Sequence, residues 1–545
     1  MNKIIFKKSG LLVILAAVLL TIQSCVKDFT NHKFEAITYS PSVAIPLVYS
    51  SLSIADLLTK GNTSGLVVVD DSNFCTIVYK NSLLSLRADS LIKLPNQQFP
   101  SYSAGLTPAE IAALGSAGIV TASYSQTVNF NSGSGTTFID SLTLKACNLN
   151  LTLNSQFPYN GQIVISIPAA KKNGVAFSQI LPFKYTGSLP VVVNANYNLA
   201  GYDVDMTVGG TTSNQFVVNY SVTLTGGGAP PPATDSISIS GSLNTIQFLK
   251  IFGDVGQLSL FPPTNKDTIA VTIFQNSLGS GVFSIVNPSL KVTISNSYGV
   301  PISATLPLLE AFNPPGSNFP LTGVPNPLPI LSPGFNQIGQ VLADSFTLNK
   351  GNSNIATVIN NDPKFFIYSG TGTSNPAGAT HANFVLDSSR CKIAIEADLP
   401  LYGTASNFVL QDTIQFSPGS FVTSNVQSAL FQIYTSNGMP IDVNMQIYFT
   451  DSLYHKLDSL VIPNQLIIRS GVLNAAGIVI APTQYTYRTT LTKARLAKLG
   501  NATHLLIKDV ESTTNKGATN VKIYSNYRID LKLGMEVLLQ VQQKL

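Results

Sequence analysis

The sequence has no tryptophan, four histidines and six glutamates in 545 residues, and only 11% of its residues are charged. Helical surfaces are normally filled with Glu, Lys, Arg and Ala, so this scarcity argues against a helical protein. Abundant Ser, Thr, Asn, Val and Ile favour strands and loops instead. The net charge of +5 is small and not clustered. Because nucleic-acid binding needs a basic stripe, we expect no nucleic-acid partner.

The chain also lacks a long apolar run. Its most hydrophobic segment, residues 11–20, is ten residues long, whereas a membrane-spanning helix needs about 20. Lys3, Lys7 and Lys8 precede this segment, and small and polar residues follow it up to residue 24. A basic start, a short apolar run and a small-residue end predict a cleaved secretory signal over residues 1–24.

The end of this signal, Ile22-Gln23-Ser24-Cys25, resembles the lipobox of bacterial lipoproteins, although Gln23 departs from the usual small residue. The resemblance implies that Cys25 becomes the mature N-terminus and carries acyl chains such as palmitate. Residues 25–39 would then form a lipidated tether to the membrane. Each buried CH₂ adds about 0.8 kcal/mol, so several chains give a durable anchor. The alternative is an ordinary secretory signal that leaves Cys25 as a free thiol.

The residues after Cys25 carry the sorting information in this family. Val26 stands where an Asp would favour retention in the inner membrane, so the resemblance implies the outer membrane of a Gram-negative cell. Lys27-Asp28 resembles a reduced form of the charged tag of some surface-exposed lipoproteins. We therefore expect a lipid-anchored outer-membrane protein, with the cell surface as one of its two candidate faces.

Three further cysteines, Cys75, Cys147 and Cys391, lie far apart and form no C-x-x-C motif. Two interpretations are open. A Cys75–Cys147 disulfide would fit an oxidising periplasm and leave Cys391 free. Alternatively, all three are reduced and act as small buried hydrophobes.

Runs of alternating apolar and polar residues recur along the chain, as at 142–145, 149–153, 163–167 and 217–224, separated by turns rich in Gly, Asn, Ser and Pro. Such period-two runs indicate half-buried strands. The predicted fold is all-β, with two or three tandem antiparallel β-sandwich-like modules and a few short helices. Segments rich in Gly and Pro, which interrupt strands, predict modules at 40–227, 235–335 and 336–545, with a Gly/Pro linker at 228–234.

Short helices are expected at three places. A capping box with Pro at the first position starts one at Thr107, residues 492–499 suggest a second that stops at Gly500, and residues 352–359 a third. A similar strand–turn–strand pattern occurs at 149–163, 288–302 and 429–441. We interpret these segments as three hairpins of three related β modules.

The sequence contains no complete motif for catalysis or metal binding. The histidines are scattered, and no nucleophile elbow or phosphate loop occurs. Glu310 and Glu396 are candidates for a glycosidase carboxylate pair, and Asp203 and Asp205 for calcium ligands, but neither pair has a completed motif. We therefore expect no enzyme activity, no catalytic or metal site and no cofactor.

One short pattern, Asp followed by Ser or Thr and then Leu or Ile, occurs seven times. It resembles the acceptor sequon of a general O-glycosylation system for exported proteins of some Gram-negative bacteria. The resemblance implies glycans on Ser90, Ser141, Ser236, Thr268, Thr413, Ser452 and Ser459. The alternative is that the pattern is a turn leading into a strand, which an all-β chain repeats.

These features predict a non-enzymatic binding or structural component of the cell envelope, with a glycan or an envelope protein as partner. The first alternative is a carrier of lipids or other apolar ligands, supported by a mean hydropathy of +0.24. Segments 191–193 and 319–321 could then line a groove. A hydrolase of surface glycans is the second alternative. A large open apolar pocket would favour the carrier, and filled cores would exclude it.

Overall fold

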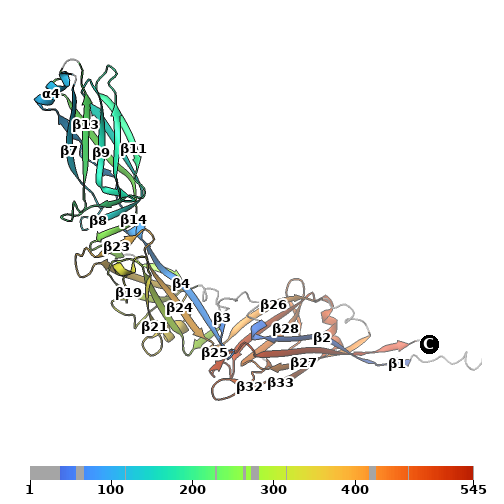
Figure 1. Cartoon of the computed structure of the whole chain (residues 1–545). Coiled ribbons are helices and arrows are strands. Elements are labelled where there is room, and N and C mark those ends of the chain that lie inside the picture. The colour runs from blue at the N-terminus through green and yellow to red at the C-terminus, as the bar shows by residue number, and fades with distance from the viewer. Residues whose placement is uncertain are drawn as a thin grey trace, which may run out of the picture. The chain divides into compact units, whose positions relative to one another are not determined.

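The computed structural model describes residues 37–543, except 57–66, 117, 228–229, 262–265, 272–280, 315, 417–424 and 464. The predicted signal, the lipobox and Cys25 therefore lie outside the described residues. The described chain consists of antiparallel sheets with a few short helices (Figure 1). This confirms the predicted all-β class. Within the described segments, no helix is both long and apolar enough to cross a membrane.

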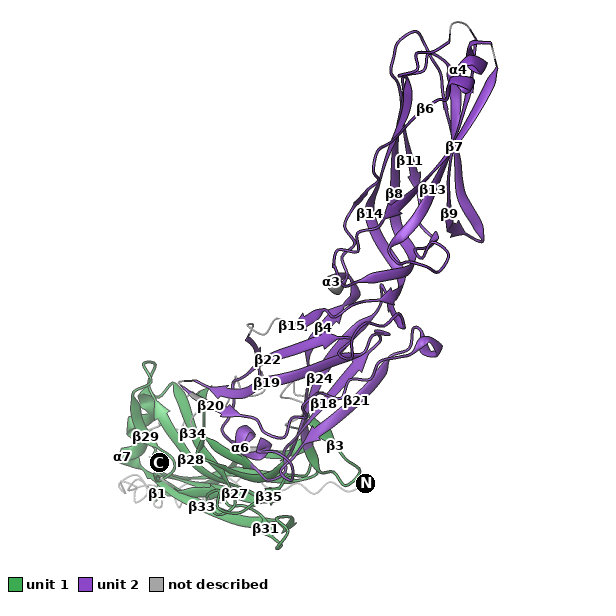
Figure 2. Ribbon diagram, turned by 90° about the vertical axis from the view of Figure 1, so that its left-hand side faces the viewer, with its two compact units in different colours: residues 1–75, 278–284, 401–545 green, residues 76–277, 285–400 purple. Residues whose placement is uncertain are grey.

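The chain forms two compact units, coloured separately in Figure 2. Unit 1 comprises residues 1–75, 278–284 and 401–545, and unit 2 comprises residues 76–277 and 285–400. These boundaries differ from the predicted modules 40–227, 235–335 and 336–545. The difference arises because β2 (Ser42–Ser53) pairs along its length with β36 (Arg528–Leu539), a partner at the other end of the chain. Gly- and Pro-rich segments, from which the module boundaries were predicted, carry no information about such distant pairing.

Unit 1 contains two main sheets that share one hydrophobic core. The four-stranded sheet has the order β2-β36-β27-β33, with β27 at Val426–Asn437 and β33 at Thr483–Thr492. The five-stranded sheet consists of β26 (Phe408–Gln415), β34 (His504–Thr513), β28 (Ile441–Thr450), β29 (Lys456–Ser459) and β30 (Leu466–Ile468). The smaller strands of this unit are β1 (Ile37–Tyr39), β3 (Val67–Val69), β25 (Tyr402–Ser406), β31 (Val472–Leu473), β32 (Val479–Ala481), β35 (Val521–Lys522) and β37 (Val541–Gln543).

Unit 2 contains three larger sheets. An eleven-stranded sheet is formed by β5 (Gln97–Gln98), β6 (Tyr102–Gly105), β7 (Ile119–Asn129), β8 (Phe138–Ser155), β9 (Asn160–Lys172), β10 (Val175–Phe183), β11 (Val191–Asn198), β12 (Asp203–Asp205), β13 (Gln215–Thr225), β14 (Ser236–Asp254) and β23 (Asn383–Leu386). A second sheet contains β21 (Leu342–Leu348), β18 (Ser289–Asn296), β24 (Arg390–Pro400) and β4 (Cys75–Arg87). The third contains β15 (Ser259–Phe261), β16 (Asp267–Ala270), β19 (Ile302–Asn313), β20 (Ser317–Pro320) and β22 (Phe365–Ser374).

The three repeated segments are not hairpins. β18 pairs with β21 and β24, whereas the following β19 pairs with β20 and β22. In the same way, β27 and β28 belong to different sheets, and β8 and β9 do not pair directly. Each segment is therefore a corner at which the chain leaves one strand and starts another elsewhere. The prediction of hairpins was wrong because an alternating strand–turn–strand pattern does not reveal the partner of each strand.

The three corners nevertheless share one detailed structure. Asn296 and Asn437, both buried at the end of a strand, each accept a hydrogen bond through Oδ1 from the backbone N–H two residues later. Ser155 accepts the equivalent bond through Oγ. The residue that donates is in every case a buried Tyr, Met or Phe. The three repeated segments thus share a polar side chain that accepts a bond from the turn backbone, followed two residues later by a buried apolar or aromatic side chain.

The expected helices are present. α4 (Pro108–Gly115) starts with the predicted capping box, in which Thr107 and Glu110 bond reciprocally. α6 (Ile355–Asn360) and α7 (Lys493–Lys498) lie within or beside the other two predicted segments. Further single turns are α3 (Ala88–Leu91), η1 (Phe335–Gln337) and η3 (Leu499–Asn501).

The Gly/Pro segment predicted as a linker at 228–234 joins β13 to β14, which belong to the same eleven-stranded sheet. Its described part is thus a loop inside one module, since glycine and proline suit a turn as well as a linker. Cys75, Cys147 and Cys391 are all buried and free. The disulfide interpretation is therefore replaced by the alternative of buried thiols.

Candidate ligand-binding cavity

An apolar cavity of about 380 Å³ lies within unit 1, between its two main sheets. Among the described residues that line it, all 19 are apolar, and both sheets and the segment between β33 and β34 contribute. Ligand pockets in proteins typically measure about 300–1,000 Å³ and are lined mainly by apolar side chains. The cavity therefore has the size and lining of a site for a small apolar ligand.

Strand alternation explains why so many apolar side chains meet here. On β36, Leu531, Leu533, Met535 and Val537 follow one another at every second position and line the cavity. Side chains at i and i+2 of a strand lie on the same face, so this row points inward and its polar neighbours point outward. β28 supplies a matching row from the opposite sheet, Met445, Ile447 and Phe449.

α7 and η3 supply two further lining residues, Leu496 and Leu499. Arg495 holds this segment to β29 by hydrogen bonds to both carboxylate oxygens of Asp458, the shortest of 2.7 Å, and by a 2.6 Å bond to the carbonyl of Ser459. Burial opposes ionisation of Asp458, but the hydrogen bonds from Arg495 and from the Ser459 N–H, together with the charges of Arg495 and Lys498, keep the pKa of Asp458 below its usual value. The ion pair thus fixes the part of the wall that the helix provides.

The residues that line the cavity differ in their exposure. Leu47 on β2 is 37% exposed and Ile414 on β26 is 47% exposed, whereas Ile433 and Phe449 are each 3% exposed. β2 and β26 are the edge strands of the two sheets. The cavity is therefore partly open, and its exposed lining side chains lie on edge strands, whereas the side chains from the inner strands are buried.

The segments that we expected to line an apolar groove, 191–193 and 319–321, belong to unit 2 and do not line this cavity. The residues that do line it have the same alternation as any half-buried strand. Sequence reasoning missed them because alternation distinguishes an inward face from an outward one, but not a filled core from a hollow one.

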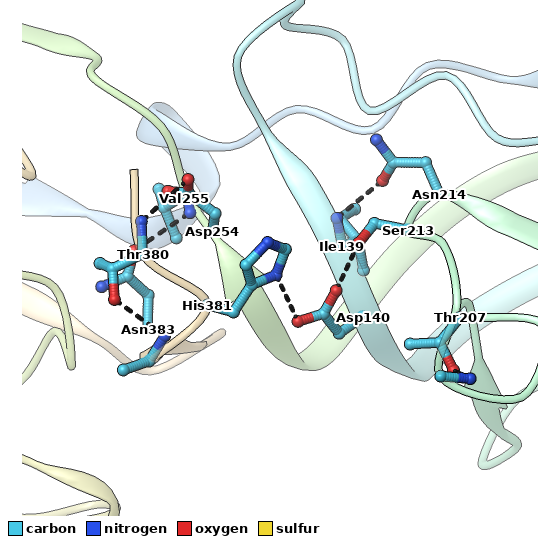
Figure 3. A network of polar contacts seen from close by, with 12 residues as sticks. Ile139, Asp140, Thr207, Ser213, Asn214, Asp254, Val255, Thr380, His381 and Asn383 are labelled. Atoms are coloured by element: carbon cyan, nitrogen blue, oxygen red, sulfur yellow. Dashed lines mark hydrogen bonds and ion pairs between the residues drawn. The ribbon is translucent and has the colours of Figure 1, made fainter. Parts of the chain in front are cut away.

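A polar network surrounds Asp140 in unit 2 (Figure 3). Ser213 Oγ donates to Asp140 Oδ1 at 2.6 Å, and His381 Nδ1 lies 2.8 Å from Asp140 Oδ2. These residue types also form the Ser-His-Asp triad, but there the histidine must bond the serine in order to remove its proton. Here the aspartate lies between the two, so the arrangement does not activate Ser213.

The carboxylates singled out in the sequence have local partners. Glu310 accepts a bond from Asn318 and Glu396 pairs with Lys80 at 3.2 Å. Asp203 and Asp205 lie on β12 and accept bonds from Thr143 and from Thr207, respectively. Among the described residues, no group of three or more His, Cys, Asp or Glu side chains is placed to hold a metal ion.

The candidate glycosylation sites differ in exposure. Thr268, Thr413 and Ser452 are exposed, Ser141, Ser236 and Ser459 are half-buried, and the side chain of Ser90 lies outside the described residues. In three sequons the aspartate accepts a bond from the next backbone N–H, at Thr268, Thr413 and Ser459. In the last, Asp458 also binds Arg495 and Leu460 lines the cavity. That copy of the pattern has a structural role.

Comparison with known proteins gives little further information. No family model matches the chain, and no curated protein matches it. A solved structure of a candidate secreted protein from Parabacteroides distasonis ATCC 8503 aligns over 91% of this chain and 99% of its own, with 11% identity and a TM-score of 0.29. The VP2 subviral particle of infectious bursal disease virus aligns over 84% and 83%, with 9% identity and a TM-score of 0.14. These scores are too low to assign a fold family or a function.

Proposed function

We propose that this protein is a non-enzymatic lipoprotein of the Gram-negative outer membrane, anchored through Cys25, and that unit 1 binds the alkyl chain of a lipid or similar amphiphile. The observation that carries the binding role is the open, wholly apolar cavity between the two sheets of unit 1. The anchor rests on the lipobox-like sequence at residues 22–25. Of the functions considered, the apolar-ligand carrier is the one that such a cavity favours.

The size of the cavity suggests the size of the ligand. A methylene group occupies roughly the volume of a water molecule, about 30 Å³, so about 380 Å³ corresponds to a dozen such groups. Burial of a dozen methylenes contributes about 10 kcal/mol before the cost of association, which is at least about 4 kcal/mol. The balance of at most about 6 kcal/mol corresponds to a dissociation constant of about tens of micromolar or weaker.

The test uses the full-length Cys25→Ala protein, so that its own acyl chains cannot compete for the site. Nile red, a neutral dye that fluoresces in apolar surroundings, reports occupancy, and dodecanol competes with it. Ala429→Phe places a large side chain in the cavity, because Ala429 is buried and lines it. Ala311→Phe is the matched control, since Ala311 is fully buried on β19 of unit 2.

We expect saturable Nile red binding that dodecanol displaces, that Ala429→Phe abolishes and that Ala311→Phe leaves intact. Binding that is indifferent to Ala429→Phe would place the dye elsewhere and contradict the proposed function.

A further inference from the structure

The side chains on the inward face of β34 change from apolar to acidic part of the way along the strand. Leu505 and Ile507 line the cavity, and the next two residues of the same row are Asp509 and Glu511. β34 pairs with both β26 and β28 without a register shift. Asp509 and Glu511 therefore lie on the same face as the two lining residues. The row of side chains that lines the cavity thus continues along β34 into two carboxylates, which lie beyond the lining residues.

The two strands that flank this pair, β26 and β28, contain no lysine or arginine. Asp509 lies opposite Leu410 on β26 and Met445 on β28, and Met445 itself lines the cavity. The nearest acid on β26 is the diagonal neighbour Asp412. The inward rows of the described strands β28, β34 and β36 contain no lysine or arginine. Glu511 is the one charged neighbour that acts on Asp509, and it acts by repulsion.

The two carboxyl groups are also poorly solvated. Burial, reinforced by the charge of Glu511, raises the pKa of Asp509 to about 6, and burial raises the pKa of Glu511. Asp509 Oδ1 is buried and has no hydrogen-bond partner in the described part of the chain. A buried polar atom without a partner is rare in proteins and calls for an explanation.

Three other acids with buried oxygens have a charged or hydrogen-bonding partner. Asp362 Oδ1 is also buried without a hydrogen-bond partner among the described residues, but Asp362 Oδ2 is paired with Lys364 at 2.7 Å. Asp254 is 2% exposed and accepts bonds from the N–H groups of Gly256 and Thr380 and from Asn375. Asp458 is paired with Arg495. Within the described part of the chain, Asp509 and Glu511 have no such partner, and they lie on the same strand face as two residues that line the cavity. Because they do not stabilise the fold, they are better explained by a role in binding a ligand.

We propose that Asp509 and Glu511 bind the cationic end of the ligand, so that the cavity selects a long-chain amine, an alkyl chain that ends in an ammonium group. This inference rests on the proposed function, because the alkyl chain occupies the apolar cavity. An ammonium group has three N–H donors and can bond both carboxylates. Charge-assisted bonds of this kind are the stronger class of hydrogen bond, and they would compensate both acids at once.

The experiment compares three 12-carbon competitors of Nile red on full-length Cys25→Ala protein at pH 8: dodecylamine, dodecanol and dodecanoate. We expect dodecylamine to displace the dye about tenfold more tightly than dodecanol, and dodecanoate to bind more weakly than dodecanol because the acids repel it. The Asp509→Asn/Glu511→Gln double variant should lose the preference for the amine and still bind dodecanol. Asp530→Asn is the matched control, since Asp530 lies on the outward face of β36 and its substitution should change nothing.

A second arm varies pH. The amine stays charged throughout, whereas Asp509 becomes protonated as the pH falls below about 6, so the preference should shrink toward that of the alcohol near pH 4.5. Equal displacement by all three competitors would overturn the inference and leave the proposed function standing. A preference that survives the double variant would also overturn it. If Nile red and dodecanol do not bind at all, both the inference and the proposed function fail.

Discussion

Substitution of Ala429 by phenylalanine tests whether the space in unit 1 is a true cavity. Burying a phenylalanine side chain contributes about 1.5–3 kcal/mol, and ordering it costs about 0.5–1 kcal/mol. The net gain of about 1–2 kcal/mol lies in the range that cavity-filling substitutions usually reach. For a unit of this size, each kcal/mol shifts the melting temperature by about 2–4 °C. We therefore expect the melting transition of unit 1 to rise by about 2–8 °C.

Differential scanning calorimetry of the full-length Cys25→Ala protein measures this shift, and the unliganded state must be used because a bound lipid would itself raise the transition. The same change at Ala311, in a filled part of unit 2, should lower stability by about 1–3 kcal/mol because overpacking forces strained side chains. A fall in the unit 1 transition on Ala429→Phe would mean that the site is already filled by protein. That result would refute the cavity.

Three further outcomes are expected. Asp458→Asn should destabilise unit 1 by about 1–3 kcal/mol, since it leaves Arg495 without its charged partner. Urea titrations at a series of pH values measure the difference in unfolding free energy between this variant and wild type. Because the pKa of Asp458 is lowered in the folded state, this difference should be present at neutral pH and vanish as the pH falls through that lowered pKa. The buried thiols should not react with Ellman's reagent at pH 8 in the native state, because burial raises the pKa of Cys147 to about 12. In denaturant, the protein acylated at Cys25 should show three reactive thiols, those of Cys75, Cys147 and Cys391. Fewer than three would restore the disulfide. If the Asp-Ser/Thr-Leu/Ile sequons are glycosylated in the native cell, glycopeptide mapping should find glycans at exposed sites such as Thr413 and none at Ser459. A glycan at Ser459 would contradict the structural role of the sequon at residues 458–460.

The local structure was largely predictable, because it depends on neighbours in sequence. Period-two alternation identified β8, β9 and β13, and the capping box at Thr107 identified the start of α4. The assignment of strands to sheets was not predictable. The turn after Asn437 has the same composition as a hairpin turn, and the difference lies in the buried amide, which bonds the backbone of both Ile441 and Arg469. That role depends on long-range packing.

The candidate site shows the same limit. The row Leu505, Ile507, Asp509 and Glu511 is visible in the sequence as alternation, but its direction depends on pairing with β26 and β28. Read alone, acids in an alternating strand indicate a solvent-facing side. The structure places them on the inward side, and an exception of this kind to local rules is where a functional site is expected.

The pairing of β2 with β36 has a consequence for the order in which the protein folds during synthesis. Ser42 and Glu536, whose side chains bond across this ladder, are 494 residues apart in the chain. A chain synthesised from its N-terminus can complete unit 2 while β2 still has no partner strand. Domains generally fold as they emerge, and unpaired edges of waiting strands are prone to aggregation. Unit 1 thus closes last, and β2 remains unpaired until the C-terminal strand β36 has been synthesised.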